Sequence, residues 1–305
     1  MTDYTILPNP SSSVFTAKLI KPDELCNDWL EKKQYEYTLK EHQYWDRLYE
    51  RQMNVLPGRA CDQFFEGLKL LEFDHGGVPD FHKTNEILEP LTGWNVVAVP
   101  ELVPDHVFFY HLANKRFPAG NFLRSQEEED YIELPDVFHD VFGHIPMLTN
   151  PTFANYIQAY GRAGWTALKY NRLKALSALY WYTVEFGLIN TDEGMRIYGA
   201  GILSSPVESR YCLEAKSPNR IHLNVDRVMR TNYKHDDLQQ SYFVIDDFEE
   251  LFKQTKARKF DQIYQNIGPS YQFAPTAVLE TDHVYDYGTQ EYALRGGKSS
   301  GATRV

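Results

Sequence analysis

Two histidines in the segment PDVFHDVFGHIP, residues 135–146, have the spacing of possible metal ligands. His139 and His144 are five residues apart, so the HExxH zinc pattern, which places its histidines four apart, does not apply. Five steps along an unbroken α-helix separate two side chains by about 140°, too far to meet at one ion. We expect Gly143 to adopt a left-handed conformation that ends the helix, and Pro146 to discourage its continuation. Both imidazoles can then turn toward one metal; two packing histidines at a helix end are the alternative.

Glu185 is the candidate for a third ligand. It lies in LYWYTVEFGLI, residues 179–189, as a single carboxylate among almost wholly apolar neighbours. Such a carboxylate is expected to be buried, and a buried charge must be paired or bound to a metal. Two imidazoles and one carboxylate with open coordination positions are the ligand set of non-haem Fe(II) oxygenases. An ion pair with an arginine, for example Arg124 or Arg196, would satisfy Glu185 as well, so both interpretations stand.

The composition argues against several classes of function. The 305 residues carry 31 Lys and Arg against 42 Asp and Glu, a net charge of −11, and no basic run exceeds two residues. Nucleic-acid-binding proteins normally show a basic face or stripe, so nucleic acid is not an expected partner. No apolar run approaches the roughly 20 residues that span a bilayer. Membrane association is therefore not expected either.

The cysteines and the N-terminal sequence point to a location. Cys26, Cys61 and Cys212 are far apart and odd in number, which predicts neither a disulfide framework nor a zinc site. Residues 1–13 are polar and lack the basic and apolar regions of a signal peptide. A reducing cytoplasm is the expected compartment.

Hydrophobic periodicity predicts a mainly α-helical fold with a few short β-strands, in one domain. We expect an irregular arm over residues 1–38, the ordered domain over 39–270, and a tail over 271–305 whose Gly/Ser-rich end is disordered. The clearest helical pattern covers 173–189, and Asp80 is expected to cap a helix that follows it. Further helices are expected over 40–53, 60–71, 104–112, 225–229 and 247–256, and strands over 94–99, 196–198 and 242–245.

Several segments, in this order along the chain, resemble the signature segments of the pterin-dependent aromatic amino acid hydroxylases. They are GWNVVAVPELVPDHVFFYHLANKRFP, PDVFHDVFGHIPML, LYWYTVEFGLIN and RIYGAGILSS. The sequence is similar above all to bacterial members that act on phenylalanine. The resemblance implies a helix-rich catalytic domain over 39–270, mononuclear Fe(II), and tetrahydrobiopterin or a related tetrahydropterin. The implied reaction converts phenylalanine to tyrosine with O2.

The resemblance also implies roles for individual residues at the metal and pterin sites. His139, His144 and Glu185 match the iron ligands. The remaining matches near iron and pterin are Asp140, an acidic residue near pterin and water; Tyr180, beside the iron; Phe108, which stacks on the pterin; and Leu102 and Val103, in the loop lining the other side of the pterin.

On the substrate side, Arg124 matches the arginine that binds the carboxylate of the amino acid, a pairing that suits the forked geometry of guanidinium. Trp181, Gly201 and Ser204 match positions around the bound amino acid. The animal enzymes have Thr-Pro where this chain has Ile132 and Glu133. We therefore expect no hydroxyl contact there and a larger share of recognition by Arg124.

Other interpretations remain at this point. Trp181 favours phenylalanine or tyrosine as substrate, because tryptophan hydroxylases of the family resemble Phe there; hydroxylation of tyrosine or tryptophan is the alternative. A zinc hydrolase could use the same three ligands, and a silent binding protein could retain Glu185 in an ion pair. The C-terminal residues show no heptad pattern of the kind that forms the tetramers of the animal enzymes. A monomer with small-molecule partners is therefore expected.

Overall fold

The computed structural model describes residues 26–74, 76–129, 134–256, 260–266 and 272–295. Within these ranges helices predominate and strands are short, so the predicted mainly α fold is confirmed. Ile132 and Glu133, as well as residues 1–25 of the arm and 296–305 of the tail, lie outside the described residues.

The α-helices are α2 (Leu39–Met53), α3 (Asp62–Leu70), α4 (Phe81–Thr92), α5 (Asp105–Ala113), α6 (Pro151–Tyr170), α7 (Leu173–Tyr180), α8 (Ala200–Leu203), α9 (Pro206–Glu214), α10 (Val225–Val228), α11 (Phe248–Lys256), α12 (Phe260–Asn266) and α13 (Glu291–Leu294). The strands are β1 (Asn95–Val99), β2 (Arg116–Gly120), β3 (Leu188–Thr191), β4 (Gly194–Ile197), β5 (Asn219–His222), β6 (Ser241–Ile245) and β7 (Val284–Asp286). Two short 3₁₀ segments, η1 (Gln126–Glu128) and η3 (Ile145–Thr149), and two π-helical segments, η2 (Phe138–His144) and η4 (Trp181–Glu185), complete the fold.

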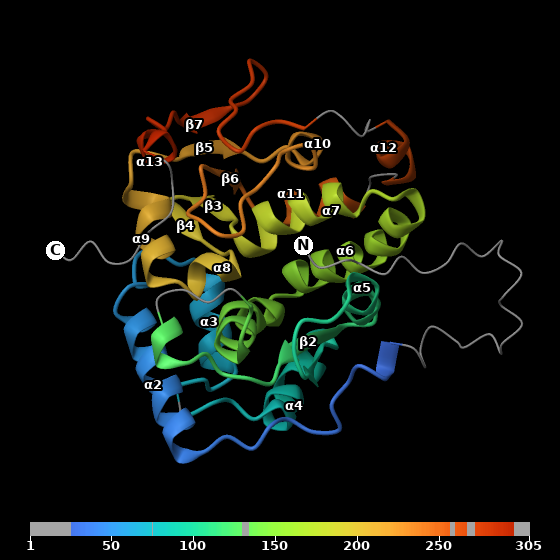
Figure 1. The fold of residues 1–305 in the computed structure, drawn as a ribbon, viewed down its shortest axis with the longest axis vertical. Helices are drawn as coiled ribbons and strands as arrows, with labels where there is room; N and C mark the ends of the chain where they lie inside the picture. Colours follow the sequence, from blue (N-terminus) through green and yellow to red (C-terminus); the bar gives the residue numbers. More distant parts are fainter. Residues whose placement is uncertain (1–25, 75, 130–133, 257–259, 267–271, 296–305) are drawn as a thin grey trace, which may run out of the picture.

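Two small sheets flank the helices. The larger has the strand order β4-β3-β6-β5-β7 and lies at the end of the molecule opposite α2 and α4 (Figure 1). The smaller pairs β1 with β2 in parallel, next to α4 and α5. β7 and α13 fall in the region expected as a tail. A buried ion pair between Arg227 and Asp282 also connects that region to the rest of the domain.

Local sequence signals explain where several helices begin. The Asp80 carboxylate accepts a hydrogen bond from the backbone of Lys83, which confirms its predicted role as the N-cap of α4. The longest helix, α6, was not predicted, although Asn150 caps it and Pro151 occupies its first turn, a typical start signal.

Helix α6 runs through the core and supports the helix that carries Phe108. Glycines on α6 let α5 approach closely: a Cβ at Gly161 would lie 2.4 Å from the backbone nitrogen of Ala113, and one at Gly164 would lie 2.1 Å from Phe109. Both distances are far below a van der Waals contact, so any larger residue would push α5 outward. These glycines therefore set the position of Phe108 through packing rather than through backbone flexibility.

Candidate metal centre and substrate site

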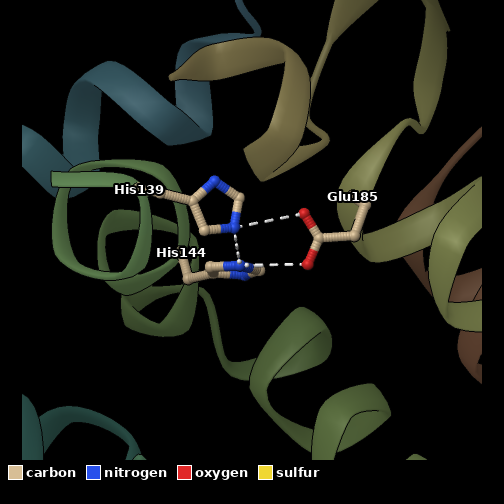
Figure 2. A group of neighbouring side chains, drawn as sticks. All are labelled: His139, His144 and Glu185. Atoms are coloured by element: carbon tan, nitrogen blue, oxygen red, sulfur yellow. Dashed lines mark hydrogen bonds and ion pairs between the residues drawn. The ribbon is translucent and has the colours of Figure 1, made fainter. Parts of the chain in front are cut away.

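The side chains of His139, His144 and Glu185 converge on one point (Figure 2). The Nε2 atoms of the two imidazoles are 3.2 Å apart, and they lie 3.4 and 3.2 Å from the two carboxylate oxygens of Glu185. Their ligand atoms fall within 4.8 Å of one another, the one such group among the described residues. Two nitrogens and one oxygen on a single side of a point leave room for further ligands, as in non-haem Fe(II) sites. The donor set thus fits iron.

A π-helix, rather than a helix end, brings the two histidines together. Both lie in η2, where the wider i→i+5 turn places residues five apart on the same side. The expected left-handed Gly143 is wrong, because Gly143 is not among the glycines with positive φ. Its lack of a side chain matters for packing instead: a Cβ there would lie 2.9 Å from the carbonyl oxygen of Ala200 in α8. Gly143 therefore allows α8 to pack against the histidine segment.

A second π-helical turn presents Glu185. The helix expected over 173–189 stops being α-helical at Tyr180, and η4 follows it, with the backbone nitrogen of Phe186 bonded to the Trp181 carbonyl five residues earlier at 2.8 Å. The strand β3 starts two residues later. Glu185 faces the two imidazoles, and the alternative partners Arg124 and Arg196 pair with Asp136 and Glu193 instead.

Hydrogen bonding fixes the tautomer of one imidazole. The Ser204 hydroxyl, on the C-terminal side of α8, donates to the carbonyl of Ala200 at 2.8 Å, so its oxygen is available to accept from Nδ1 of His139 at 2.9 Å. With the proton on Nδ1, the lone pair of Nε2 points at the metal position, as a ligand requires. Burial lowers the pKa of His139 to about 4, which keeps the imidazole neutral.

The electrostatics of Glu185 suit a ligand as well. Burial alone would raise the pKa of this carboxyl, but its interactions with the imidazoles of His144 and His139 and its hydrogen bonds from His144 and the backbone of Gly201 outweigh burial and hold the pKa below its ordinary value. The carboxyl is therefore an anion at neutral pH. A cation placed between these three residues would strengthen this preference.

Asp140 and Tyr180 lie close to the same centre. Asp140 is buried, and its Oδ2 accepts a hydrogen bond from the backbone of Gly120 in β2 at 2.8 Å. Burial raises the pKa of Asp140 to about 7. The Tyr180 ring stacks near His144, with ring centroids 6.3 Å apart, and contacts the edge of Phe108 at 5.7 Å. Asp140, which belongs to η2, and Tyr180, which lies near the His144 ring, are therefore both next to the candidate metal ligands.

The predicted pterin residues occupy two different environments. Phe108 is partly exposed and packs edge-on against the rings of Phe117 and Tyr180. Val103 is buried in a cluster with Cys26 and Val107 that Phe108 also contacts. Leu102, by contrast, is 61% exposed. The loop therefore anchors itself through Val103 and presents Leu102 to its surface.

Arg124 is held by an aspartate that the sequence analysis did not single out. Nε and the backbone nitrogen of Arg124 donate to Oδ2 of Asp136, both at 2.9 Å, and Nη2 donates to Oδ1 at 2.7 Å. Oδ1 also accepts from the backbone of His139 at 2.9 Å. This side-on pairing leaves the two N–H groups of Nη1 for a ligand. An aspartate three residues before the first histidine is the N-cap pattern, which could have identified it.

Of the remaining predicted substrate residues, Trp181 belongs to η4 together with Glu185, and Gly201 and Ser204 lie in α8 and directly after it. A Cβ on Gly201 would lie 2.9 Å from the ring of Phe186 and 3.1 Å from the Glu185 carbonyl, so glycine allows this close approach. The indole of Trp181 packs against the rings of Phe186 and Tyr233 and donates a hydrogen bond to Gln239. The sequence analysis missed Tyr233 and Gln239, because they reach the site from a loop about 50 residues away with no motif of its own.

Comparisons with known proteins identify the family of this chain. The model of the biopterin-dependent aromatic amino acid hydroxylases matches residues 30–279. The phenylalanine-4-hydroxylase of Caulobacter vibrioides is 54% identical over 276 residues, 90% of this chain and 94% of that protein, and the one from Chromobacterium violaceum is 51% identical over 255 residues, 84% and 86%. The crystal structure of the C. violaceum enzyme with iron and phenylalanine bound matches with a TM-score of 0.80 at 50% identity, covering 85% of this chain and 94% of that one. This chain therefore belongs to the biopterin-dependent aromatic amino acid hydroxylase family.

Proposed function

We propose that this protein is a phenylalanine 4-monooxygenase, which converts L-phenylalanine to L-tyrosine with O2 and a tetrahydropterin at one mononuclear non-haem Fe(II). The observation that carries the proposal is the convergence of His139, His144 and Glu185 in a chain of this family. When bound, the iron and the reduced pterin supply the activation of O2 that ring hydroxylation needs. Membership in this family argues against the two alternative functions, a zinc hydrolase and a silent binding protein.

The protein's contribution is to hold its ligands in place. His139, His144 and Glu185 would hold the metal. The hydrogen bond to Ser204 sets the tautomer of His139, so that its Nε2 would be free to bind. The side chains of His144 and Glu185 are only 4% and 12% exposed, and low exposure to water strengthens electrostatic interactions inside the site. Asp140, which follows His139 in η2, and Tyr180, whose ring centroid lies 6.3 Å from that of His144, would border the metal site.

Phe108 would stack on the pterin ring, with Leu102 and Val103 lining its other side. Edge contacts to Phe117 and Tyr180 and the glycine-mediated packing of α5 on α6 support a fixed position for the Phe108 ring. A rigid aromatic platform loses little entropy when a flat ligand binds.

Arg124 would bind the carboxylate of the amino acid with the N–H groups that Asp136 leaves available. Trp181, Gly201 and Ser204 would surround the rest of the substrate. The Trp181 indole favours phenylalanine over tryptophan, and relatives named as phenylalanine-4-hydroxylases at 51% to 54% identity support the same substrate.

We further propose a monomer that acts in the cytoplasm, with residues 39–270 as the catalytic domain, 1–38 as an arm and 271–305 as a tail that contributes β7 to the larger sheet of the domain. A net charge of −11 adds repulsion between copies, and Cys61 and Cys212 are free thiols, as a reducing compartment favours. No helix in the described part of the chain has both the length and the apolar character to cross a membrane. Light scattering should give a mass near 35.5 kDa; a dimer or tetramer would contradict this proposal.

A product assay with a panel of substrates tests the proposed reaction. Metal-free protein receives one equivalent of Fe(II), tetrahydrobiopterin and air, together with phenylalanine, tyrosine or tryptophan, and the products are identified by mass spectrometry. We expect tyrosine from phenylalanine with kcat/KM far above that for the other two amino acids. Preferred hydroxylation of tyrosine or tryptophan, or tyrosine formation without pterin, would refute the proposal.

A further inference from the structure

Three contacts hold the Trp181 indole. One of them distinguishes the two orientations, or flips, that are related by a half-turn of the ring. The ring lies against Tyr233, with centroids 4.6 Å apart and planes 20° apart, and against Phe186 at 4.7 Å and 35°. One stacked and one tilted ring contact restrain the plane of the indole but accept an indole flipped by half a turn. The indole Nε1 donates to Oε1 of Gln239 at 2.8 Å, and this bond exists in only one flip.

The amide of Gln239 is itself oriented by the backbone around it. Its Nε2 donates to the carbonyls of Lys234 and Asp237 at 2.9 and 3.1 Å, so both amide hydrogens are used. The oxygen is then the atom that faces the indole, which is a donor only. Gln239 is 2% exposed, so water cannot easily replace any of these partners. The amide therefore presents a fixed acceptor to Trp181.

A buried glutamate fixes the backbone that carries this amide. Oε1 of Glu208 accepts a hydrogen bond from the backbone nitrogen of Gln239 at 3.2 Å and another from the Tyr242 hydroxyl. Glu208 is 5% exposed and lies on α9, which directly follows the segment that carries Ser204. Glu208 therefore connects the loop of Gln239 to α9. Ser204, which lies between α8 and α9, orients the candidate metal ligand His139.

We propose that Gln239, held by Glu208, is a positioning residue that locks the Trp181 indole in one flip and so sets the shape of the pocket for the aromatic ring of the substrate. The inference rests on the proposed function, because it takes Trp181 as a wall of the substrate site. The two edges of an indole differ in size and polarity, so a ring that alternates between flips presents an ill-defined wall. Losing the lock should weaken phenylalanine binding and relax discrimination against larger amino acids.

The test combines a spectroscopic readout with kinetics on the full chain. In metal-free protein labelled with ¹⁵N, the Trp181 indole signal is assigned by its absence in Trp181→Phe. Gln239→Leu should move this signal and speed its hydrogen exchange. In the iron-loaded enzyme the same variant should raise KM for phenylalanine by roughly two- to tenfold, the usual net worth of one neutral hydrogen bond, with KM for pterin unchanged. The phenylalanine-to-tryptophan ratio of kcat/KM should fall.

Gln240→Leu is the matched control. Gln240 is the adjacent residue, is also 2% exposed, and its side-chain amide donates to Leu238 instead of bonding to Trp181. It should leave the indole signal and both KM values as in wild type. Glu208→Gln keeps an acceptor oxygen for Gln239 and should retain the wild-type KM for phenylalanine, whereas Glu208→Leu should raise it.

Gln239→Met, with a longer and more adaptable side chain, serves if the leucine variant does not fold. In a Trp181→Phe background, replacing Gln239 with leucine or methionine should not raise KM for phenylalanine further, because the indole N–H that Gln239 accepts is already gone. An unchanged indole signal in Gln239→Leu, or a moved signal with unchanged KM for phenylalanine, would overturn the inference. A wild-type protein that makes no tyrosine would instead overturn the proposed function, while the spectroscopic result would still decide whether the lock exists.

Discussion

Replacing Asp136 with asparagine should damage both the stability of the protein and its recognition of phenylalanine. Asp136 is fully buried, and its two oxygens accept four hydrogen bonds, three from Arg124 and one from the backbone of His139. Asparagine has nearly the same shape but only one oxygen. In either orientation of its amide, the NH2 group faces two of the four donors. The substitution also leaves the Arg124 guanidinium buried without a counter-charge.

The magnitude follows from these losses. Breaking a buried ion pair by removing one partner costs about 3–5 kcal/mol, because the remaining charge is not solvated. At roughly 2–4 °C per kcal/mol for a domain of this size, the melting temperature should fall by about 6–20 °C. Arg124 also loses the contact that orients its free N–H groups. KM for phenylalanine should therefore rise much more than KM for pterin.

Thermal unfolding of the metal-free chain, followed by circular dichroism, measures the stability effect. Glu193→Gln is the control, since Glu193 is 82% exposed and forms an ion pair with Arg196, which should be worth at most about 1 kcal/mol. Adding Arg124→Met to the Asp136→Asn variant should recover part of the loss, because no unpaired charge remains. A melting temperature of Asp136→Asn within about 2 °C of wild type would refute the reasoning.

Further predictions concern Arg124, Gly143 and Glu208. Arg124→Lys should raise KM for phenylalanine about ten- to a hundredfold in steady-state assays, because an ammonium cannot make the forked contact; an unchanged value would remove Arg124 from substrate binding. Gly143→Ala should weaken Fe(II) affinity in metal titrations, since its Cβ would lie 2.9 Å from the carbonyl of Ala200 and displace α8; wild-type affinity would show that α8 does not position His139. Burial raises the pKa of Glu208 from 4.5 to about 7, so this carboxyl stabilises the fold below pH 4.5 and the stabilisation is lost as pH rises toward 7. In urea unfolding of metal-free protein, Glu208→Gln should therefore gain up to about 3 kcal/mol relative to wild type between pH 5 and pH 8, and a constant difference would contradict the burial argument.

The sequence singled out the three candidate metal ligands but not the geometry that joins them. Two histidines and a lone carboxylate in an apolar segment are visible as residue types, and the resemblance to a family assigned them together. The α-helical repeat, however, could not explain a five-residue spacing, and the expected break at Gly143 was wrong. A π-helix is a local insertion stabilised by packing against α8, and no short-range signal in the sequence marks it.

The elements were predicted where periodicity and caps coincide, as at Asp80 and in the segment 225–229. Helix α6 was not predicted, although Asn150 and Pro151 mark its start and could have identified it. Gln239 and Glu208 are different. Their roles arise from contacts between segments about 30 to 60 residues apart, which only the tertiary structure brings together.

The iron content of purified protein tests the central claim most directly, because the claim is that His139, His144 and Glu185 hold one catalytic iron. Metal-free wild type, reloaded with Fe(II) and desalted, should contain one iron per chain by elemental analysis. The His139→Ala/His144→Ala double variant should contain almost none while keeping its helical circular dichroism. His82→Ala, which removes an imidazole that is 83% exposed, should bind iron like wild type. One iron per chain in the double variant would contradict the account.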